Sequence, residues 1–338
     1  MNILSRKLRP VFVVGCHRSG TNLLYDTLLS AGGFSVYRGY LPVYEILLPH
    51  FGSFDNLRNR QRLVDTFLKS KAFRRAGVDA APLSSKLLAE CRNGGDFIRI
   101  VMDDIAQSQG AQRWAVYDPD NVLHITQITK DIPDSLFIHI VRDGRDIALS
   151  LTKMGGFRPI PWSPHTGSLL ETGLYWDWMV QQGRQQGRRI PADYIEVHYE
   201  QLVTQPRAVL ARLGDFLDHD LDYDRILKAG LGSVREPNSS FLGDEEEAQH
   251  PINRWKEKLS QHQVGALENL IGSSLREFGY PLTAGGQKRL GLPERCLAAL
   301  YPRFLTTKHW LKLNTSMGRF SSLSALDLQD SVSDPGAI

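Results

Sequence analysis

A glycine-rich segment near the start of the chain carries residues that could bind a phosphate group. It is Gly15-Cys-His-Arg-Ser-Gly-Thr-Asn22, between a short apolar run and an amphipathic pattern of helical spacing. Its two glycines stand five positions apart, which lets the backbone curl so that N–H groups at a helix start converge on an anion. The frame is that of a nucleotide phosphate loop, GxxxxGK[ST]. Thr21 occupies the lysine position and Asn22 the position of the Mg²⁺ ligand, so the nearest cation is Arg18.

This departure from the nucleotide loop leaves several interpretations open. A P-loop NTPase or kinase that uses Mg-ATP needs the metal to neutralise the γ-phosphate. A loop without the lysine, and with a weaker metal ligand, favours a less charged transferable group. The segment could also belong to a nucleotide-binding protein without catalytic activity, or be a strand-to-helix turn with incidental glycines.

A second candidate phosphate site follows the strongest strand pattern of the chain. The run Leu136–Val141 ends in Arg142, and Ser150 stands eight residues after that arginine. A guanidinium at the carboxyl end of a strand and a hydroxyl in the next helix can converge on one phosphate. We interpret the charged residues between them as a helix cap and a solvated surface; these are Asp143, Arg145 and Asp146.

Together the two motifs resemble those of the sulfotransferases that use 3′-phosphoadenosine-5′-phosphosulfate (PAPS). His-Arg-Ser-Gly-Thr-Asn is similar to the family's 5′-phosphosulfate loop, PRSGTT or PKSGTT, and Arg142 with Ser150 is similar to its 3′-phosphate pair. Residues 194–203 resemble the family's strand–YEDL–helix segment, and residues 253–260 resemble its late basic loop. The matches run in family order over about residues 10 to 280. The branch that the chain resembles contains the protein-tyrosine sulfotransferases and many bacterial relatives, which does not imply a protein substrate.

The resemblance implies a reaction and a set of binding residues. The sulfuryl group of PAPS, as co-substrate, would pass to an acceptor hydroxyl or amine with release of adenosine 3′,5′-bisphosphate, without a metal. The loop and Arg18 would hold the 5′-phosphosulfate, and Tyr199 would lie near the adenine. Either Arg254 or Lys256 would close over the 3′-phosphate. The implied binding residues are Arg18, Ser19, Gly20, Thr21, Asn22, Arg142, Ser150, Tyr199, Arg254 and Lys256.

The residue that takes the acceptor proton departs from the family pattern. The protein-tyrosine branch has a Glu shortly after the first helix, whereas this chain has Tyr-Arg-Gly-Tyr at 37–40. We favour Glu45 as the base because it is the nearest carboxylate, although its spacing fits a surface residue equally well. The alternative is His124, which could also be structural, and the next candidates are Asp118 and Asp120.

The sequence also lacks the lysine that often assists the leaving group in this family. The family often has a Lys before an Asp-Pro or Thr-Pro pair, where this chain has Tyr117 before Asp118-Pro119. Arg18, as a catalytic residue, would then assist the leaving group, or a residue that the sequence does not reveal would do so.

The elements that must position these residues alternate along the chain. Apolar, β-branched runs predict buried strands at 11–14, 114–117, 136–141 and 194–198. Amphipathic periodicity predicts helices after the phosphate loop, at 56–77, 95–110 and 168–188, and from Pro206. This alternation predicts an α/β fold: a single-domain, P-loop-like, doubly wound parallel sheet with helices on both faces.

The ends of this domain are set by composition. We place the sulfotransferase-like domain at residues 1–285 and a C-terminal extension at 286–338. The Ser-, Asp- and Gly-rich chain beyond about residue 315 predicts disorder, and the polar stretch 236–250 predicts a mobile loop. The proline- and aromatic-rich segment 157–165 is a candidate lining of the acceptor pocket.

Composition and charge restrict the partners and the compartment. The 338 residues include 40 basic and 37 acidic ones, and a net charge of +3 is too small for a dedicated nucleic-acid binder. Arginine outnumbers lysine by 28 to 12, which suits bidentate binding of oxyanions. The three cysteines have no metal-ligand spacing, and the chain shows no signal peptide or long apolar run. We therefore expect a cytoplasmic protein without a transmembrane segment, acting on a small-molecule, glycan or peptide acceptor, in an oligomeric state that the sequence does not indicate.

Overall fold

A four-stranded parallel sheet forms the centre of the molecule. The computed structural model describes residues 5–154, 168–235, 252–283 and 291–328. The strands are β1 (Val11–Gly15), β2 (Ala115–Tyr117), β3 (Leu136–Val141) and β4 (Tyr194–His198), in the order β2-β1-β3-β4. All three pairings are parallel. The four predicted strands are confirmed, each within one residue of its expected ends.

The strand order reverses at β1, which determines where a ligand can bind. Val11 of β1 pairs with Ala115 of β2 on one side and with Leu136 of β3 on the other. In open α/β sheets, ligands bind outside the carboxyl ends of the strands at such a reversal. The phosphate loop after β1, Asp118 after β2 and Arg142 after β3 all follow strand ends at this edge.

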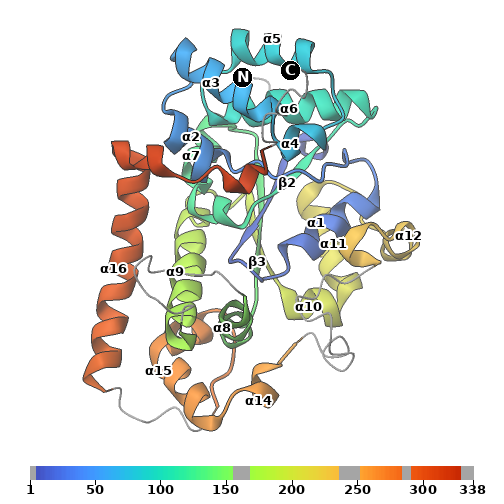
Figure 1. Ribbon diagram of the computed structural model, residues 1–338. Coiled ribbons are helices and arrows are strands. Elements are labelled where there is room, and N and C mark those ends of the chain that lie inside the picture. Colours follow the sequence, from blue (N-terminus) through green and yellow to red (C-terminus); the bar gives the residue numbers. More distant parts are fainter. Residues whose placement is uncertain (1–4, 155–167, 236–251, 284–290, 329–338) are drawn as a thin grey trace, which may run out of the picture.

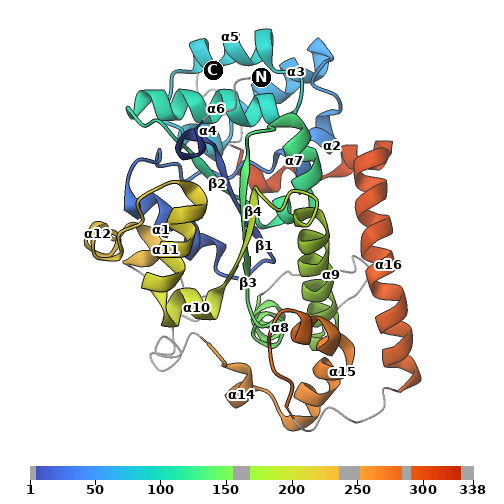
Figure 2. The same ribbon diagram turned by 180° about the vertical axis from the view of Figure 1, so that it is seen from behind.

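Helices cover both faces of the sheet, as Figures 1 and 2 show. Alternate residues of β1 point to opposite faces: Val11 and Val13 belong to one apolar cluster, and Phe12 and Val14 to the other. The first cluster is completed by α1 (Thr21–Ala31), α11 (Pro206–Leu217) and α12 (Tyr223–Ala229), with α10 (Tyr199–Thr204) beside them. The second contains residues of α3 (Leu57–Leu68), α5 (Ala80–Glu90), α6 (Gly94–Ser108), α7 (Ile125–Asp131), α8 (Gly144–Lys153), α9 (Leu169–Gly187), α15 (Gln261–Glu277) and α16 (Leu292–Asn314). The doubly wound α/β fold is thereby confirmed.

The shorter elements lie mostly between these helices. They include η2 (Val43–Leu47), η3 (Pro119–Leu123), α2 (Leu48–Phe51), α4 (Lys71–Arg74) and α14 (Trp255–Lys258). The amphipathic stretch 56–77 forms two helices, α3 and α4, instead of one. The break has a local cause, because Ser70 caps α4 by accepting a hydrogen bond from the Phe73 N–H.

The C-terminal segment is ordered further than its composition indicates. α16 runs alongside α9 (Figure 1), and two 3₁₀ turns follow it, η5 (Ser316–Phe320) and η6 (Ser324–Leu326). Leu326 is only 1% exposed, and Asp327 pairs with Lys71 at 2.8 Å. Packing of η5 against α2 and α16, and the contact of Asp327 with α4, therefore order residues 315–328, where composition predicted disorder. Residues 329–338 and the predicted mobile loop at 236–250 lie outside the described residues, and the domain division at 285 stays a prediction.

Within the described part of the chain, none of the helices is both long and apolar enough to cross a membrane.

Candidate active site

The phosphate loop joins the end of β1 to the start of α1. Gly20 has φ 95°, and a Cβ atom at this position would lie 2.4 Å from the Tyr199 ring, so only glycine fits. Arg18 also lies in the left-handed region, with φ 72°, although it is not a glycine. Backbone strain of this kind tends to be retained where it places a functional group. The turn is held by the buried Ser19, whose N–H donates to the Cys16 carbonyl at 3.1 Å.

Three arginines from separate segments converge beside this loop. The Nε of Arg18 donates to Ser150 Oγ at 3.1 Å, and Arg142 donates to the Arg18 carbonyl at 3.3 Å. The Arg142 guanidinium lies over the Tyr199 ring, 4.4 Å from its centroid. Burial, and then the charges of Arg142 and Arg254, lower the pKa of Arg18. Like charges that approach one another in this way suit an anionic ligand that balances them.

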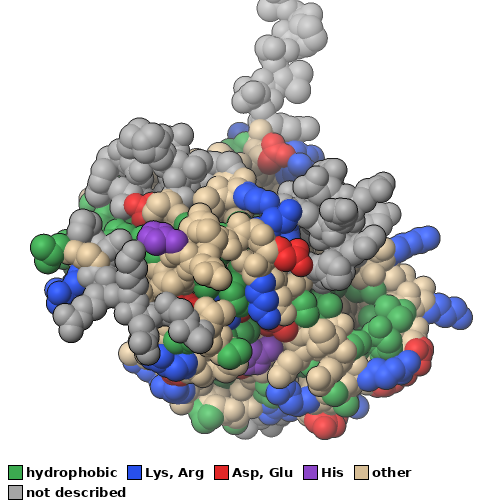
Figure 3. Space-filling view, turned by 90° about the horizontal axis from the view of Figure 1, so that it is seen from below, with side chains coloured by type: hydrophobic (Ala, Val, Ile, Leu, Met, Phe, Trp, Pro, Cys, Tyr) green, Lys and Arg blue, Asp and Glu red, His purple; other side chains and the backbone are tan. Residues whose placement is uncertain are grey.

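Basic side chains are visible near the middle of the face seen from below, toward the carboxyl ends of the strands (Figure 3). Of the two alternatives in the late basic loop, Arg254 lies among the other arginines, since its charge acts on both Arg18 and Tyr199. Lys256 is exposed and lies over the Trp255 ring, 5.6 Å from its centroid. Thr21 is buried and Asn22 half-buried at the start of α1.

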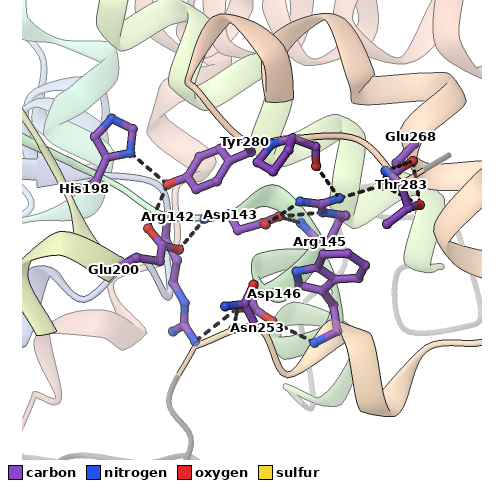
Figure 4. Close-up of polar contacts among 12 residues, drawn as sticks. Arg142, Asp143, Arg145, Asp146, His198, Glu200, Asn253, Glu268, Tyr280 and Thr283 are labelled. Carbon is purple, nitrogen blue, oxygen red and sulfur yellow. Dashed lines mark hydrogen bonds and ion pairs between the residues drawn. The ribbon is translucent and has the colours of Figure 1, made fainter. Parts of the chain in front are cut away.

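The position of Arg254 depends on two residues of α8 that the sequence analysis assigned to a cap and a solvated surface. The Asp146 carboxylate accepts hydrogen bonds from the backbone N–H groups of Asn253 and Trp255, both at 2.9 Å (Figure 4). The Arg145 guanidinium stacks on the Trp255 ring at 3.7 Å. Arg254 is thus held between two residues that α8 anchors.

The expectation that Arg145 is solvated was wrong. Its side chain is 1% exposed and forms ion pairs with Asp143 at 2.7 Å and Glu268 at 2.6 Å. Burial acts to lower the pKa of Arg145, but these two carboxylates raise it. Arg145 is enclosed because the segment from α14 to α15 covers α8 (Figure 4). Asp143 does cap α8, accepting from the Arg145 N–H at 2.9 Å.

The two residues considered as alternative bases contact each other. Glu45 comes from η2 and His124 from the junction of η3 and α7, and their Oε2 and Nε2 atoms lie 2.9 Å apart. The second carboxylate oxygen of Glu45 pairs with Lys312 of α16. Burial acts to raise the pKa of Glu45, but His124 and Lys312 lower it to about 2. Glu45 is therefore a partly buried, ionised carboxylate and not a plain surface residue.

These residues include a set of donors that a metal ion could use. Glu45, His124 and His309 present one ligand atom each, and the three atoms lie within 4.8 Å of one another. Two imidazoles and a carboxylate are a donor set that zinc accepts. The Lys312 ammonium, however, contacts the same carboxylate and opposes a second cation there.

His17 is a site residue that the sequence analysis missed. It stands in the phosphate loop where the related motif has proline, and its Nε2 lies 3.0 Å from Asp120 Oδ1. Burial acts to lower the pKa of His17, but Asp120 raises it above its usual 6.5. The position of His17 in the phosphate loop was the signal that could have identified it from the sequence. A histidine there lies, like Arg18, at the edge of the sheet where β1 ends.

The Asp118 carboxylate is engaged in contacts that hold the local backbone and a neighbouring tyrosine. It caps η3 by accepting from the Asp120 N–H at 3.1 Å, and it also accepts from the Tyr40 hydroxyl at 3.4 Å. Burial, and then the charge of Asp120, raise the pKa of Asp118. The segment 157–165 lies outside the described residues.

The part of the chain from β1 to the start of α12 matches a known protein family. Residues 10–223, more than half of the chain, match a family model described as "Sulfotransferase family". A Caenorhabditis elegans protein described as "Putative protein-tyrosine sulfotransferase" is 27% identical over 112 residues, which are 33% of this chain and 42% of that protein. The chain thus spans less than half the length of this curated relative.

Solved structures of sulfotransferases also align with the chain. The sulfotransferase domain of the olefin synthase of Synechococcus PCC 7002 is 18% identical, with a TM-score of 0.48, and covers 81% of this chain and 96% of its own. A sulfotransferase of Mycobacterium avium is 17% identical, with a TM-score of 0.44, and the match covers 81% of this chain and 78% of its own.

Proposed function

The chain belongs to the sulfotransferase family, and from this premise we propose that it transfers the sulfuryl group of PAPS to an acceptor hydroxyl or amine. The observation that carries the proposal is the convergence of Arg18, Arg142 and Arg254 beside the phosphate loop. Burial, and then the charges of Arg142 and Arg254, lower the pKa of Arg18, and such a group of guanidinium side chains suits a ligand with anionic groups. PAPS has two such groups, at its 5′ and 3′ positions.

The residues fit PAPS as a co-substrate. The loop backbone from Ser19 to Asn22 and the Arg18 side chain would hold the 5′-phosphosulfate. Arg142, Ser150 and Arg254 would hold the 3′-phosphate, with Tyr199 beside the adenine. When bound, PAPS supplies the sulfuryl group and an adenosine 3′,5′-bisphosphate leaving group.

Side chains of this protein would take up the acceptor proton and stabilise the negative charge that develops on the leaving group. The Glu45–His124 pair would take the proton from the acceptor, since one partner is an ionised carboxylate and the other an imidazole. Arg18 and protonated His17 would stabilise negative charge on the leaving group, in the place of the absent lysine. We propose that no metal is required, because these cations stand where an NTPase loop would use lysine and Mg²⁺.

A thermal-shift comparison tests the nucleotide that the site binds. Adenosine 3′,5′-bisphosphate without Mg²⁺ should raise the melting temperature, whereas Mg-ATP should have little effect. Stabilisation by Mg-ATP alone would contradict the proposal and favour an NTPase or kinase. Turnover of radiolabelled PAPS with a panel of small-molecule, glycan and peptide acceptors then separates an enzyme from a nucleotide-binding protein without activity.

A further inference from the structure

We propose that helix α16 completes the acceptor end of the active site, with Lys312 as the residue that positions the Glu45 carboxylate. This inference rests on the proposed function. α16 lies beyond residues 10–223, to which the family match is confined, and within the C-terminal extension that we place at 286–338. The extension would then be part of the catalytic unit.

The contacts of Glu45 carry this inference. Its Oε2 faces His124 Nε2 at 2.9 Å and His309 Nδ1 at 3.7 Å, and its Oε1 pairs with the Lys312 ammonium. The Glu45 side chain is 18% exposed and the Lys312 side chain 26% exposed. Because both are largely withdrawn from water, their attraction is screened less than that of a surface pair.

α16 is fixed on both sides of this contact. On the side of α9, the Trp178 indole N–H donates to Thr306 Oγ1 at 3.1 Å, and Tyr301 is buried. After α16, the Ser321 carbonyl lies 2.9 Å from Nδ1 of His50, three residues beyond η2, the element that carries Glu45. The helix backbone that carries Lys312 is therefore held by packing on both sides, within reach of Glu45.

The contact has a defined chemical consequence. A lysine that holds Oε1 orients the other oxygen, Oε2, toward His124 and keeps the carboxylate ionised. It also places a positive charge beside the Glu45–His124 pair, which opposes proton uptake by the pair. Lys312 helps to lower the pKa of Glu45, so without this charge the Glu45 carboxylate would take up a proton at a higher pH.

Other charged and titratable groups face the same region from each neighbouring element. They are Lys308 on α16, His17 in the phosphate loop, Asp118 and Asp120 at the start of η3, Tyr40 before η2 and Tyr175 on α9. A variant that changes only Lys312 leaves all of them in place, so a shift in its pH profile reports the removed charge.

Lys312→Met in the full chain is the first test, with Arg303→Met as a matched control, because Arg303 is an exposed basic residue of the same helix. We expect Lys312→Met to lower kcat about tenfold, the scale of one charge-assisted contact, and to move the acidic limb of the rate–pH profile to higher pH. The affinity for adenosine 3′,5′-bisphosphate should stay unchanged, and Lys312→Arg should restore most of the rate. A wild-type rate and pH profile in Lys312→Met would overturn the inference.

A titration of the histidines followed by NMR tests the same contact without turnover. Burial, His124 and Lys312 hold the pKa of His309 at about 4, against the opposing charge of Glu45. Lys312→Met should raise the titration midpoint of His309, which His309→Gln assigns, and an unchanged midpoint would contradict the contact. This measurement separates a failure of the α16 inference from a failure of the proposed sulfotransferase activity.

A metal ion at Glu45, His124 and His309 is the competing occupant. Loss of activity on treatment with EDTA, restored by Zn²⁺, would overturn the lysine contact in favour of a metal site. Activity that is unchanged by EDTA supports the lysine contact.

Discussion

The carboxylate of Glu45 and the imidazole of His124 lie 2.9 Å apart, although 79 residues separate them in the chain. Sequence reasoning treated these residues as competitors for one role. The hydrogen bond joins them into one unit, in which the carboxylate orients the ring and stabilises the positive charge formed when a proton is taken up. Substitution of either residue should therefore impair the transfer step to a similar extent.

The first prediction concerns this pair. Glu45→Gln and His124→Ala should each lower the single-turnover transfer rate by about 10²–10⁴. The double variant should be little slower than the slower single variant, because residues that act as one unit give non-additive losses.

Rapid-quench measurement of the first turnover checks this prediction. Glu90→Gln and His262→Ala are matched controls, since both side chains are exposed and lie outside the site. Fully additive losses would mean that the two residues act independently, and a silent Glu45→Gln would leave His124 as the sole base.

The second prediction concerns the bound bisphosphate. Arg142→Ala should weaken its binding by roughly ten- to hundredfold, because a charge-assisted phosphate contact is worth about 1.5–3 kcal/mol. Arg254→Ala should behave similarly, whereas Lys256→Ala should change the affinity less than about twofold. Isothermal titration calorimetry with adenosine 3′,5′-bisphosphate checks all three, and equal effects of Arg254→Ala and Lys256→Ala would contradict the placement of Lys256.

The parts of this site that could be predicted are those that depend on local sequence. β1 is an apolar run and β3 is apolar apart from His139. Arg18, three residues after β1, and Arg142, directly after β3, therefore had to lie at one edge of the sheet. Ser150 follows Arg142 within the next helix, so its approach to the same place follows from the spacing alone.

The parts that could not be predicted depend on partners far away in the chain. Nothing in the local pattern indicates that Lys312 contacts Glu45, since 267 residues separate them. Arg145 reads as a solvated helix residue until Glu268, 123 residues later, is brought against it. The order at residues 315–328 likewise comes from packing against α2, α4 and α16, which composition does not indicate.

The third prediction separates positioning from charge at Asp146. This carboxylate lies 4.0 Å from Arg142, so by charge alone its removal would strengthen the binding of an anion. It also holds the N–H groups of Asn253 and Trp255, on either side of Arg254. We expect positioning to prevail, and Asp146→Ala to weaken bisphosphate binding about tenfold.

The control for this prediction is Glu257→Ala, which removes an exposed carboxylate on α14. It should leave the affinity unchanged or raise it slightly. Asp146→Asn keeps one acceptor oxygen and should lose less affinity than Asp146→Ala. Tighter binding of the bisphosphate by Asp146→Ala would show that the charge of Asp146 affects the affinity more than its hydrogen bonds to the backbone of residues 253–255 do.

The fourth prediction concerns pH and His17. If protonated His17 stabilises the leaving group, kcat must fall as the pH rises through the pKa of this residue, because the cation is then lost. Asp120 raises that pKa above 6.5. Asp120→Asn removes the charge that stabilises the imidazolium, so the fall in kcat should begin at a lower pH than in the wild type.

His17→Gln provides the complementary measurement. It should lower kcat by about 10²-fold, the loss that follows removal of one group that stabilises the developing charge, and the fall of kcat with rising pH that belongs to His17 should disappear. The affinity for adenosine 3′,5′-bisphosphate should change little, because Arg18 and the loop backbone remain. Rate–pH profiles of the wild type and both variants at saturating PAPS decide the matter: if the basic limb keeps its position in Asp120→Asn, the group that titrates there is not His17, and Arg18 alone would carry the charge of the leaving group.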